Sequence, residues 1–257
     1  MKITLLGTGT SQGVPVIGCQ CDVCQSKNSK DNRLRTSALV EWDNHKYVID
    51  CGPDFRAQML REGISVIDGI LFTHEHADHT AGLDDIRPIF FQKKAPIPLF
   101  ALQRVLNDLS KRYQYIFTKE HKYPGAPDVD ENVLIAGKPF VLSGKEVLPL
   151  AIMHGNLPIL GYKFGNFAYI TDAKYIDDIT MNELQNLDLL IINALHHREH
   201  KTHLNLKEAL ALIEILQPKK AVLTHISHYM GLYDDVQKTL PDNVVLAYDG
   251  MQLKVKE

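Results

Sequence analysis

The sequence predicts an α/β protein, more fully an α+β arrangement, in which short buried strands alternate with amphipathic helices. Three observations predict it. Apolar runs rich in β-branched residues recur along the chain, segments with helical spacing lie between them, and histidine or aspartate follows directly on several of the runs. Hydrophobic residues make up 45% of the 257 residues, which is enough for a packed core. Because no fixed repeat or linker is visible, we expect one domain over residues 1–257.

The first half of the chain predicts a strand, a hairpin, a helix and a further strand. The first strand ends at the turn Gly7-Thr8-Gly9, and Asp43-Asn44-His45 is a hairpin turn. The helix has its apolar residues on one side and ends at Gly63. The predicted strands cover residues 2–6, 36–42, 46–51 and 67–72, and the helix covers residues 54–62.

The second half predicts two clear helices and a series of short strands. The helices cover residues 102–112 and 206–216, the second ending before Pro218. A hairpin is expected across Gly165-Asn166. The predicted strands cover residues 147–153, 161–164, 167–171, 187–192, 221–223, 244–247 and 252–255, and we expect the last two to close one sheet.

Residues 113–131 form an insertion between the first of these helices and the strands that follow. It interleaves aromatic residues with Lys119, His121 and Lys122 before it turns acidic. Aromatic and basic residues together can stack on nucleic-acid bases. Because the segment is short and its end is acidic, we prefer a surface lid or the contact of a homodimer.

Charge and hydropathy argue against two classes of partner. The formal net charge is -3 and the pI is near 6.5, so the basic footprint of a nucleic-acid-binding protein is missing, which disfavours that partner without excluding it. The chain has no apolar run of about 18 residues, so we expect no membrane partner. Because the apolar run at the start is too short for a signal peptide, we expect a cytoplasmic protein.

A loop over residues 8–32 contains three of the four cysteines. Cys19, Cys21 and Cys24 lie within six residues, and such crowding in a chain expected to stay in the cytoplasm favours a metal site over disulfides. Buried inert thiols or a redox pair are the alternatives. Cys51 stands alone and is interpreted as a small buried hydrophobic residue.

Residues 73–79, directly after a predicted strand, contain three imidazoles and two carboxylates. Further histidine and aspartate residues follow three later strands, so folding is expected to bring all of them to one edge. Imidazole and carboxylate suit divalent ions such as Zn or Mn, and seven such groups suit two ions better than one. The seven candidate ligands are His74, His76, Asp78, His79, His154, Asp172 and His225.

These residues stand in ordered motifs that resemble the metallo-β-lactamase superfamily over nearly the whole chain. The motifs are Gly-Thr-Gly-Thr at 7–10, Asp-Cys-Gly at 50–52, His-x-His-x-Asp-His at 74–79, and the later His154, Asp172 and His225. The resemblance implies an αββα four-layer sandwich, with two mixed sheets flanked by helices. It implies that His74, His76 and His154 hold one ion, that Asp78, His79 and His225 hold the other, and that Asp172 bridges them. It also implies that Asp50 supports the metal ligands and need not bind an ion itself.

A narrower resemblance is to the phosphoribosyl cyclic phosphate phosphodiesterases of bacterial phosphonate catabolism. It rests on Gly13-Val14-Pro15, Gly18-Cys19-x-Cys21-x-x-Cys24, residues 223–228 and residues 248–251. It implies that Cys19, Cys21, Cys24 and His228 bind a structural zinc, and Cys₃His is an accepted closed zinc set. It also implies hydrolysis of a small phosphodiester, such as a cyclic ribose phosphate, by a metal-bridging hydroxide. Asp78 would then orient the hydroxide, and His203 would be the general acid.

Three other functions stay open. RNA 3′-end processing endonucleases share similar openings and the same ligand series. A diiron redox protein is a second alternative, although that branch carries Glu where this chain has His76. A non-catalytic metal-binding protein is the third. For the general acid, His196 is the second choice after His203, and an exposed histidine at a helix entry is the plain interpretation of His203.

Overall fold

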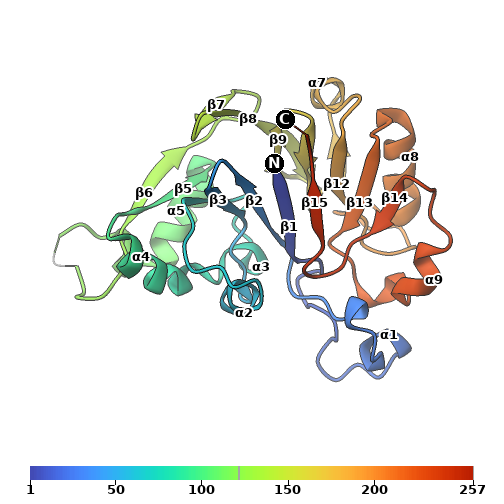
Figure 1. Cartoon of the computed structure of the whole chain (residues 1–257), viewed down its shortest axis with the longest axis horizontal. Helices are drawn as coiled ribbons and strands as arrows, with labels where there is room; N and C mark the ends of the chain where they lie inside the picture. Colours follow the sequence, from blue (N-terminus) through green and yellow to red (C-terminus); the bar gives the residue numbers. More distant parts are fainter. Residues whose placement is uncertain (121, 257) are drawn as a thin grey trace.

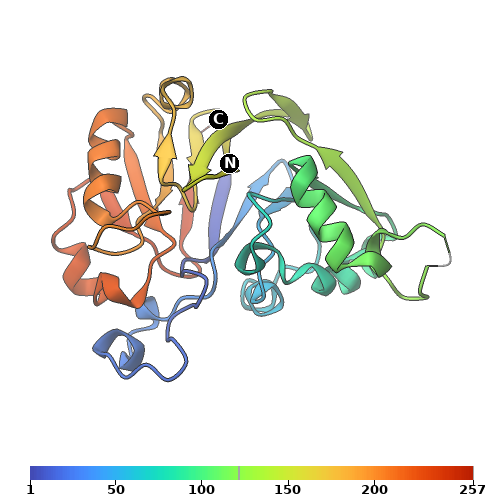
Figure 2. The same ribbon diagram turned by 180° about the vertical axis from the view of Figure 1, so that it is seen from behind.

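Two mixed β-sheets lie face to face at the centre of the computed structural model, which describes residues 1–120 and 122–256 (Figure 1). Helices cover the outer face of each sheet, so the predicted αββα sandwich is confirmed. Seen from behind, the cyan and green helices line the first sheet and the orange helices line the second (Figure 2). His121, which the sequence places in the basic part of the insertion, lies outside the described residues.

The first sheet is built from both ends of the chain, in the order β15-β1-β2-β3-β4-β5-β6. It is antiparallel from β15 to β3 and parallel from β3 to β6. The sequence did not predict β5, because the prolines at 96 and 98 are untypical of a strand interior. The strands are β1 (Lys2–Gly7), β2 (Ser37–Trp42), β3 (His45–Ile49), β4 (Gly69–Leu71), β5 (Ile97–Ala101), β6 (Val129–Val133) and β15 (Gln252–Lys254).

The second sheet follows the order β11-β8-β9-β10-β12-β13-β14, with β7 paired to β8. Its last four strands run parallel. The expectation that residues 244–247 and 252–255 close one sheet was wrong, because β14 joins β13 here and β15 joins β1 in the first sheet. The strands are β7 (Phe140–Leu142), β8 (Lys145–His154), β9 (Leu157–Phe164), β10 (Phe167–Tyr169), β11 (Tyr175–Ile176), β12 (Leu189–Asn193), β13 (Lys220–Thr224) and β14 (Val244–Leu246).

The helices are short, and the best formed has the predicted bounds. Helix α8 covers Leu206–Leu216 and begins with a capping box, in which Asn205 and Glu208 bond each other's backbone N–H. Among the described residues no helix is both long and apolar enough to cross a bilayer. The other α-helices are α1 (Asp22–Gln25), α2 (Phe55–Arg61), α3 (Ala77–Thr80), α4 (Arg87–Lys93), α5 (Gln103–Arg112), α6 (Gln114–Phe117), α7 (Asp178–Glu183) and α9 (Tyr233–Gln237), and the 3-10 turns are η1 (Ser29–Asp31), η2 (Leu83–Ile86) and η3 (His228–Met230).

Strand alternation gives the molecule two large apolar layers. On β2, Val40 faces the core between the sheets, while its neighbour Leu39 faces the core beneath the helices. Ile49 and Val48 divide in the same way on β3. Both faces of the first sheet are therefore covered, and its strand ends are the free edge at which polar side chains can gather.

The loop that carries the cysteines stands apart from this sandwich. Helix α1 and its flanking loops lie below the two sheets in Figure 1. The insertion also projects, at the far edge of the first sheet beside α4 (Figure 1). There Lys122 bonds the carboxylate of Asp128 and the carbonyl of Ile116, and the exposed rings of Phe91 and Tyr123 both lie near Gly125.

Candidate metal centres

The predicted histidine and aspartate side chains meet where β4, β8, β10 and β13 end. Three overlapping groups offer ligand atoms that all lie within 4.8 Å of one another. His74, His154 and Asp172 each belong to two of them, so the groups form one continuous cluster. The groups are His74 with His76 and His154, His74 with His79 and Asp172, and His154 with Asp172 and His203.

The backbone at this edge is strained at residues that carry the chemistry. Asp50, Asp172 and His225 adopt φ values of 63°, 57° and 55°, in the left-handed region that a residue with a Cβ rarely occupies. Such strain costs about 1–3 kcal/mol per residue and gathers at functional sites. Each of the three follows a strand end, so the positive φ is what turns its side chain back toward the cluster.

His74 is held in one tautomer by its neighbour. The hydroxyl of Thr73 donates its hydrogen to Asp50 Oδ2 at 2.8 Å, so the 3.0 Å contact with His74 Nδ1 must be an N–H donated to the hydroxyl oxygen. The lone pair of His74 therefore lies on Nε2, which is 2.9 Å from Nδ1 of His76. Burial and the nearby His79 hold the pKa of His74 well below its ordinary value, so it stays neutral.

His79 gives the clearest test of whether a cation fits. Its Nδ1 donates to Asp50 Oδ2 at 2.7 Å, and its buried Nε2 has no hydrogen-bond partner among the described residues. That Nε2 lies 3.2 Å from an oxygen of Asp78 and 3.2 Å from an oxygen of Asp172. A lone pair facing two carboxylates is repelled unless a positive charge lies between them, so the arrangement fits a metal ion.

The same positive charge can be supplied by a proton on His79. Burial opposes it, but Asp172, Asp78 and Asp50 outweigh burial and hold the pKa of His79 well above its ordinary value. Burial would likewise raise the pKa of Asp172, yet His225 and His79 hold it well below the usual range. The cluster therefore keeps its carboxylates ionised, as ligands of a divalent ion must be.

His154 and His225 are tethered in the same way as the first two imidazoles. Nδ1 of His154 donates to the carbonyl of Thr202 at 2.8 Å. Thr36 donates its hydroxyl hydrogen to Gly9, so its 3.2 Å contact with His225 must be an N–H donated by Nδ1. The remaining Nε2 of His225 lies 3.2 Å from Asp172 Oδ1. Four imidazoles thus present Nε2 lone pairs and use Nδ1 for orientation, as metal-binding histidines do.

His203 lies against this cluster without such a tether. Its ring centroid is 4.6 Å from that of His154 and 4.9 Å from that of His225. Its Nδ1 is 3.5 Å from Asp172 Oδ1 and has no hydrogen-bond partner among the described residues. Burial and the neighbouring His225 lower the pKa of His203 to about 3. The structure therefore places His203 at the site, whereas His196 lies farther out, beyond His200.

Two arginines of α5 grip the loop that carries His74 and His76. Arg104 pairs with the carboxylate of Glu75 at 3.2 Å and donates to the carbonyl of Pro158 in β9, just after the turn that follows His154. Arg112 donates to the carbonyl of Glu75 and to the hydroxyl of Thr80, both at 3.0 Å. Sequence analysis did not single out either arginine, because each looks like an ordinary charged residue on the polar face of a helix.

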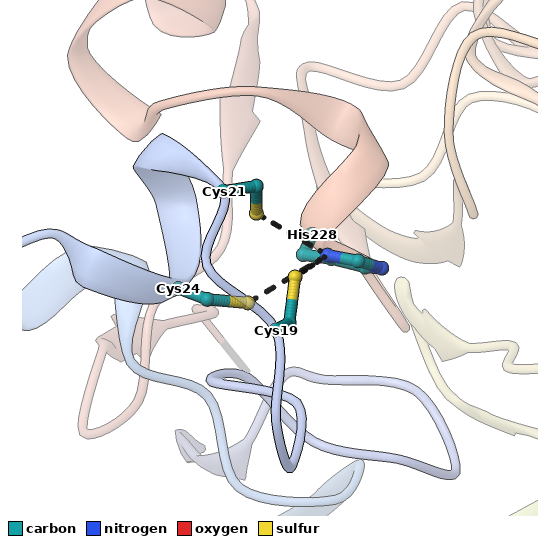
Figure 3. Close-up of side chains that lie close together, drawn as sticks. All are labelled: Cys19, Cys21, Cys24 and His228. Carbon is teal, nitrogen blue, oxygen red and sulfur yellow. Dashed lines mark hydrogen bonds between the residues drawn. The ribbon is translucent and has the colours of Figure 1, made fainter.

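The three clustered cysteines meet His228 below the sheets. In Figure 3 the three sulfurs face Nδ1 of the imidazole, at 3.3 Å for Cys19, 3.4 Å for Cys21 and 3.6 Å for Cys24. The four ligand atoms all lie within 4.8 Å of one another. Cys51 is fully buried in the core beneath the helices, as expected.

The thiols of this cysteine cluster differ in acidity. The backbone N–H of Cys24, together with His228 and Cys19, lowers the pKa of Cys21 to about 6 despite the effect of burial. Burial raises the pKa of Cys24 to about 11 in the absence of a cation. Three sulfurs and one imidazole nitrogen at this spacing match the donor set of a closed zinc site, which would hold all three sulfurs as thiolates.

The two clusters are joined by a short piece of chain. His225 belongs to the first and His228 to the second, and Ile226 between them donates its N–H to the carbonyl of Thr8 at 2.8 Å. Gly9 pairs with both Ile226 and Arg35, so it ties this segment to the edge of the first sheet. A Cβ on Gly9 would lie 2.9 Å from the carbonyl oxygen of Arg33, which explains the glycine.

Comparison with known proteins gives a family and a group of relatives. Residues 45–226 match the family described as the Beta-lactamase superfamily domain. A crystal structure of a new diphosphatase from the PhnP family is 39% identical, covers 99% of this chain and 98% of its own, and has a TM-score of 0.92.

Two curated relatives extend the comparison. An octanoyltransferase of Porphyromonas gingivalis is 41% identical over 100% of this chain, but the chain spans only 52% of that longer protein. A ribonuclease Z of Borrelia duttonii is 26% identical over 88% of this chain and 93% of its own length.

Proposed function

Because this chain belongs to the metallo-β-lactamase superfamily, a hydrolase family that binds divalent metal ions, we propose that it is a binuclear metal-dependent phosphodiesterase. The proposed substrate is a small phosphodiester, with a cyclic ribose phosphate as one candidate. The observation that carries the proposal is the set of four imidazoles tethered at Nδ1 around Asp172, with His203 beside them and free of a tether.

One proposed ligand set coincides with a group of the cluster, and the other is supported by the contacts among Asp78, His79, Asp172 and His225. His74, His76 and His154 would hold one ion, and Asp78, His79 and His225 the other, with Asp172 between them. When bound, two divalent ions supply an activated water at neutral pH and neutralise the charge of the phosphate. Mn and Zn both suit this mixture of imidazole and carboxylate.

Two side chains of the protein, Asp78 and His203, would complete the proposed mechanism. Asp78 lies at the rim of the cluster, where its carboxylate can accept a hydrogen bond from the attacking water and orient it. His203 is placed to protonate the leaving oxygen. In the protein alone its pKa of about 3 leaves it neutral at pH 7, and an anionic phosphate beside it would raise that pKa, so that His203 takes up a proton from solvent before it donates one to the leaving oxygen.

Turnover of bis(p-nitrophenyl) phosphate by purified protein with defined Mn or Zn tests the proposal. We expect hydrolysis that a chelator abolishes and that His203→Ala lowers by about 10²–10⁴-fold, the usual contribution of a general acid. His45→Ala, a histidine at the far end of β3, is the control and should retain activity. Metal-loaded protein without any phosphodiesterase activity would refute the proposal.

A second candidate is RNA 3′-end processing, supported by the likeness to ribonuclease Z of Borrelia duttonii. The net charge of -3 argues against it, because RNA affinity depends on a basic surface. Cleavage of a precursor RNA at rates above those for small esters would favour it. A non-catalytic or diiron redox protein would show metal binding, or a redox change, with no ester turnover at all.

The remaining features of the proposal concern placement and assembly. We propose that the protein is cytoplasmic and that the ion of the cysteine cluster is zinc. A homodimer through the insertion stays a proposal, and the measured mass of the protein in solution tests it.

A further inference from the structure

We propose that Arg33 is a positioning residue of the metal centre, which acts through Thr8 to hold His225 where it can bind the second ion. The second ion is the one proposed to bind Asp78, His79 and His225. The inference rests on the binuclear site of the proposed function and concerns a residue outside its ligand set. Arg33 lies between η1 and β2 and is only 3% exposed.

The guanidinium of Arg33 is buried where three segments of the chain meet. Its Nη1 donates to the hydroxyl of Thr8 at 2.9 Å and to the carbonyl of Ala247. The Thr8 hydroxyl donates its own hydrogen to Asp249 Oδ1 at 2.8 Å, and Asp249 Oδ2 accepts the backbone N–H of Leu34 at 2.8 Å. Thr8 is therefore fixed between a cation and a carboxylate from distant parts of the sequence.

Both groups carry their charge at neutral pH. Burial lowers the pKa of Arg33 to about 10, so the guanidinium stays protonated. Burial raises the pKa of Asp249 to about 6, so the carboxylate is mostly ionised at pH 7. Arg61 also faces this carboxylate, at 3.3 Å. Because both hydrogen bonds of the Thr8 hydroxyl involve a charged partner, they are stronger than bonds between neutral groups.

Thr8 and its neighbour Gly9 in turn hold His225 in two places. The carbonyl of Thr8 accepts the N–H of Ile226, directly after His225, at 2.8 Å. The carbonyl of Gly9 accepts the hydroxyl hydrogen of Thr36 at 2.7 Å, and the same hydroxyl accepts the N–H of His225 Nδ1. A displacement of Thr8 would therefore move both the backbone and the ring of His225.

His225 needs this support because its backbone is strained. A residue with a φ of 55° keeps that conformation only where its surroundings fix it. The imidazoles proposed for the first ion depend on other contacts, His74 on Thr73 and His154 on Thr202. Loss of the Arg33 side chain should therefore affect the second ion and leave the first in place.

Stability alone does not explain a buried arginine at this position. Nη2 of Arg33 is buried and has no hydrogen-bond partner in the described part of the chain, so its charge is only partly compensated. Apolar side chains of similar volume are often as stabilising as a buried ion pair, or more so. The arginine is explained by what it holds, which is Thr8.

The position of Arg33 depends on the cysteine loop. Its backbone exchanges two hydrogen bonds with Val14, at 2.7 and 2.8 Å. Val14 belongs to the small apolar group of that loop. Arg33 thus connects the cysteine loop to His225 by a route separate from the chain between His225 and His228.

A titration of metal-free protein with Mn, followed by electron paramagnetic resonance, tests this role without a substrate. Two Mn ions in one centre couple and broaden the spectrum, whereas a lone ion gives the resolved hyperfine pattern of isolated Mn. We expect Arg33→Met to raise the Kd of the second ion by about tenfold to a hundredfold, the usual effect of residues that support metal ligands, and to leave that of the first unchanged.

Further variants make the result specific. Arg33→Lys keeps a charged donor and should recover part of the affinity for the second ion. Thr8→Val removes the hydroxyl between Arg33 and Asp249 and should weaken the second ion in the same way, whereas Thr8→Ser should bind both ions like wild type. Because Thr8→Val keeps both charges, it decides the question even if Arg33→Met does not fold. Arg56→Met, an exposed change on α2, is the control and should bind both ions.

The outcomes that contradict the proposal differ from failure of the proposed function. Equal weakening of both ions would show a general structural role, and unchanged binding of the second ion in Arg33→Met and Thr8→Val would refute any role. Wild-type protein that binds only one ion at the site would overturn the proposal as well. If wild-type protein turns over no phosphodiester but the variants lose the second ion selectively, the phosphodiesterase is refuted and the role of Arg33 is kept.

Discussion

The histidine-aspartate cluster and the cysteine cluster share the segment from Thr224 to Met230, but the protein holds them in different ways. In the first, four imidazoles are fixed at Nδ1 by Thr73, Asp50, Thr202 and Thr36. In the second, the three sulfurs share His228 Nδ1, and backbone N–H groups support two of them, Val16 at 3.4 Å from Cys24 and Cys24 beside Cys21.

This difference separates a site built by the fold from a site that an ion must complete. The strand ends and their supporting hydrogen bonds position the first cluster, so its geometry can survive loss of metal. The cysteine loop has only a small apolar group of its own, around Val14 and Val23. We therefore propose that it depends on a bound ion, with zinc as the proposed one, for much of its order, as small metal-bound loops do.

Breaking the first cluster at its centre should have the largest effect. Asp172→Asn keeps the shape of the side chain but removes the charge that faces His79 and His225. We expect kcat/KM to fall by more than about a hundredfold, since even groups behind metal ligands contribute about 10–100-fold. Metal analysis should show loss of active-site ions with one zinc per chain retained. Activity within tenfold of wild type would contradict the central role of Asp172.

Breaking the second cluster should act at a distance. Cys21→Ala removes one of the four proposed zinc donors and frees the loop that positions His228. We expect a lower unfolding temperature and, because His225 lies three residues before His228, active-site metal retention weakened by about tenfold.

The matched control for this variant is Cys51→Ala. Cys51 is equally a thiol, but it is fully buried away from the cluster. The Cys51→Ala variant should have a slightly lower free energy of unfolding, because it leaves a small cavity, and its zinc content should be unchanged. Unchanged active-site metal content and activity in Cys21→Ala would show that the two clusters are independent.

The sequence predicted the chemistry of the first cluster better than its support. Histidine and aspartate after buried strands could be found by pattern, and α8 has the predicted bounds of residues 206–216. The pattern could not divide β14 and β15 between two sheets, because periodicity reports a strand and not its partner. Helix α4 was missed for a similar reason, since its proline gives no sign of the long-range packing that stabilises it.

The contacts of Arg104 and Arg112 in α5 with the loop that carries His74 could be found only from the tertiary structure. They give a third test. Arg104→Ala removes the contacts to Glu75 and to the carbonyl of Pro158, which tie together the loops of two proposed ligand groups. We expect kcat/KM to fall by about tenfold, with the zinc of the cysteine cluster retained. Lys111→Ala, an exposed change on the same helix, is the control and should behave as wild type. A loss of both kinds of metal would point to general unfolding instead.

The smallest effect is expected from pH, and it tests the claim that the cysteine cluster is incomplete without its ion. The folded chain lowers the pKa of Cys21 from 9.0 to about 6, so in metal-free protein its thiolate stabilises the fold fully above pH 9, and this contribution is lost as pH falls through about 6. Alkylation of metal-free protein should therefore modify Cys21 with a midpoint near pH 6, while Cys24, with a pKa of about 11, should react only in strong base. Mass spectrometry of the alkylated peptides separates the two residues. If Cys21 instead reacts with a midpoint near pH 9, the sulfurs do not meet His228 without zinc, and the ion assembles the cluster as well as closing it.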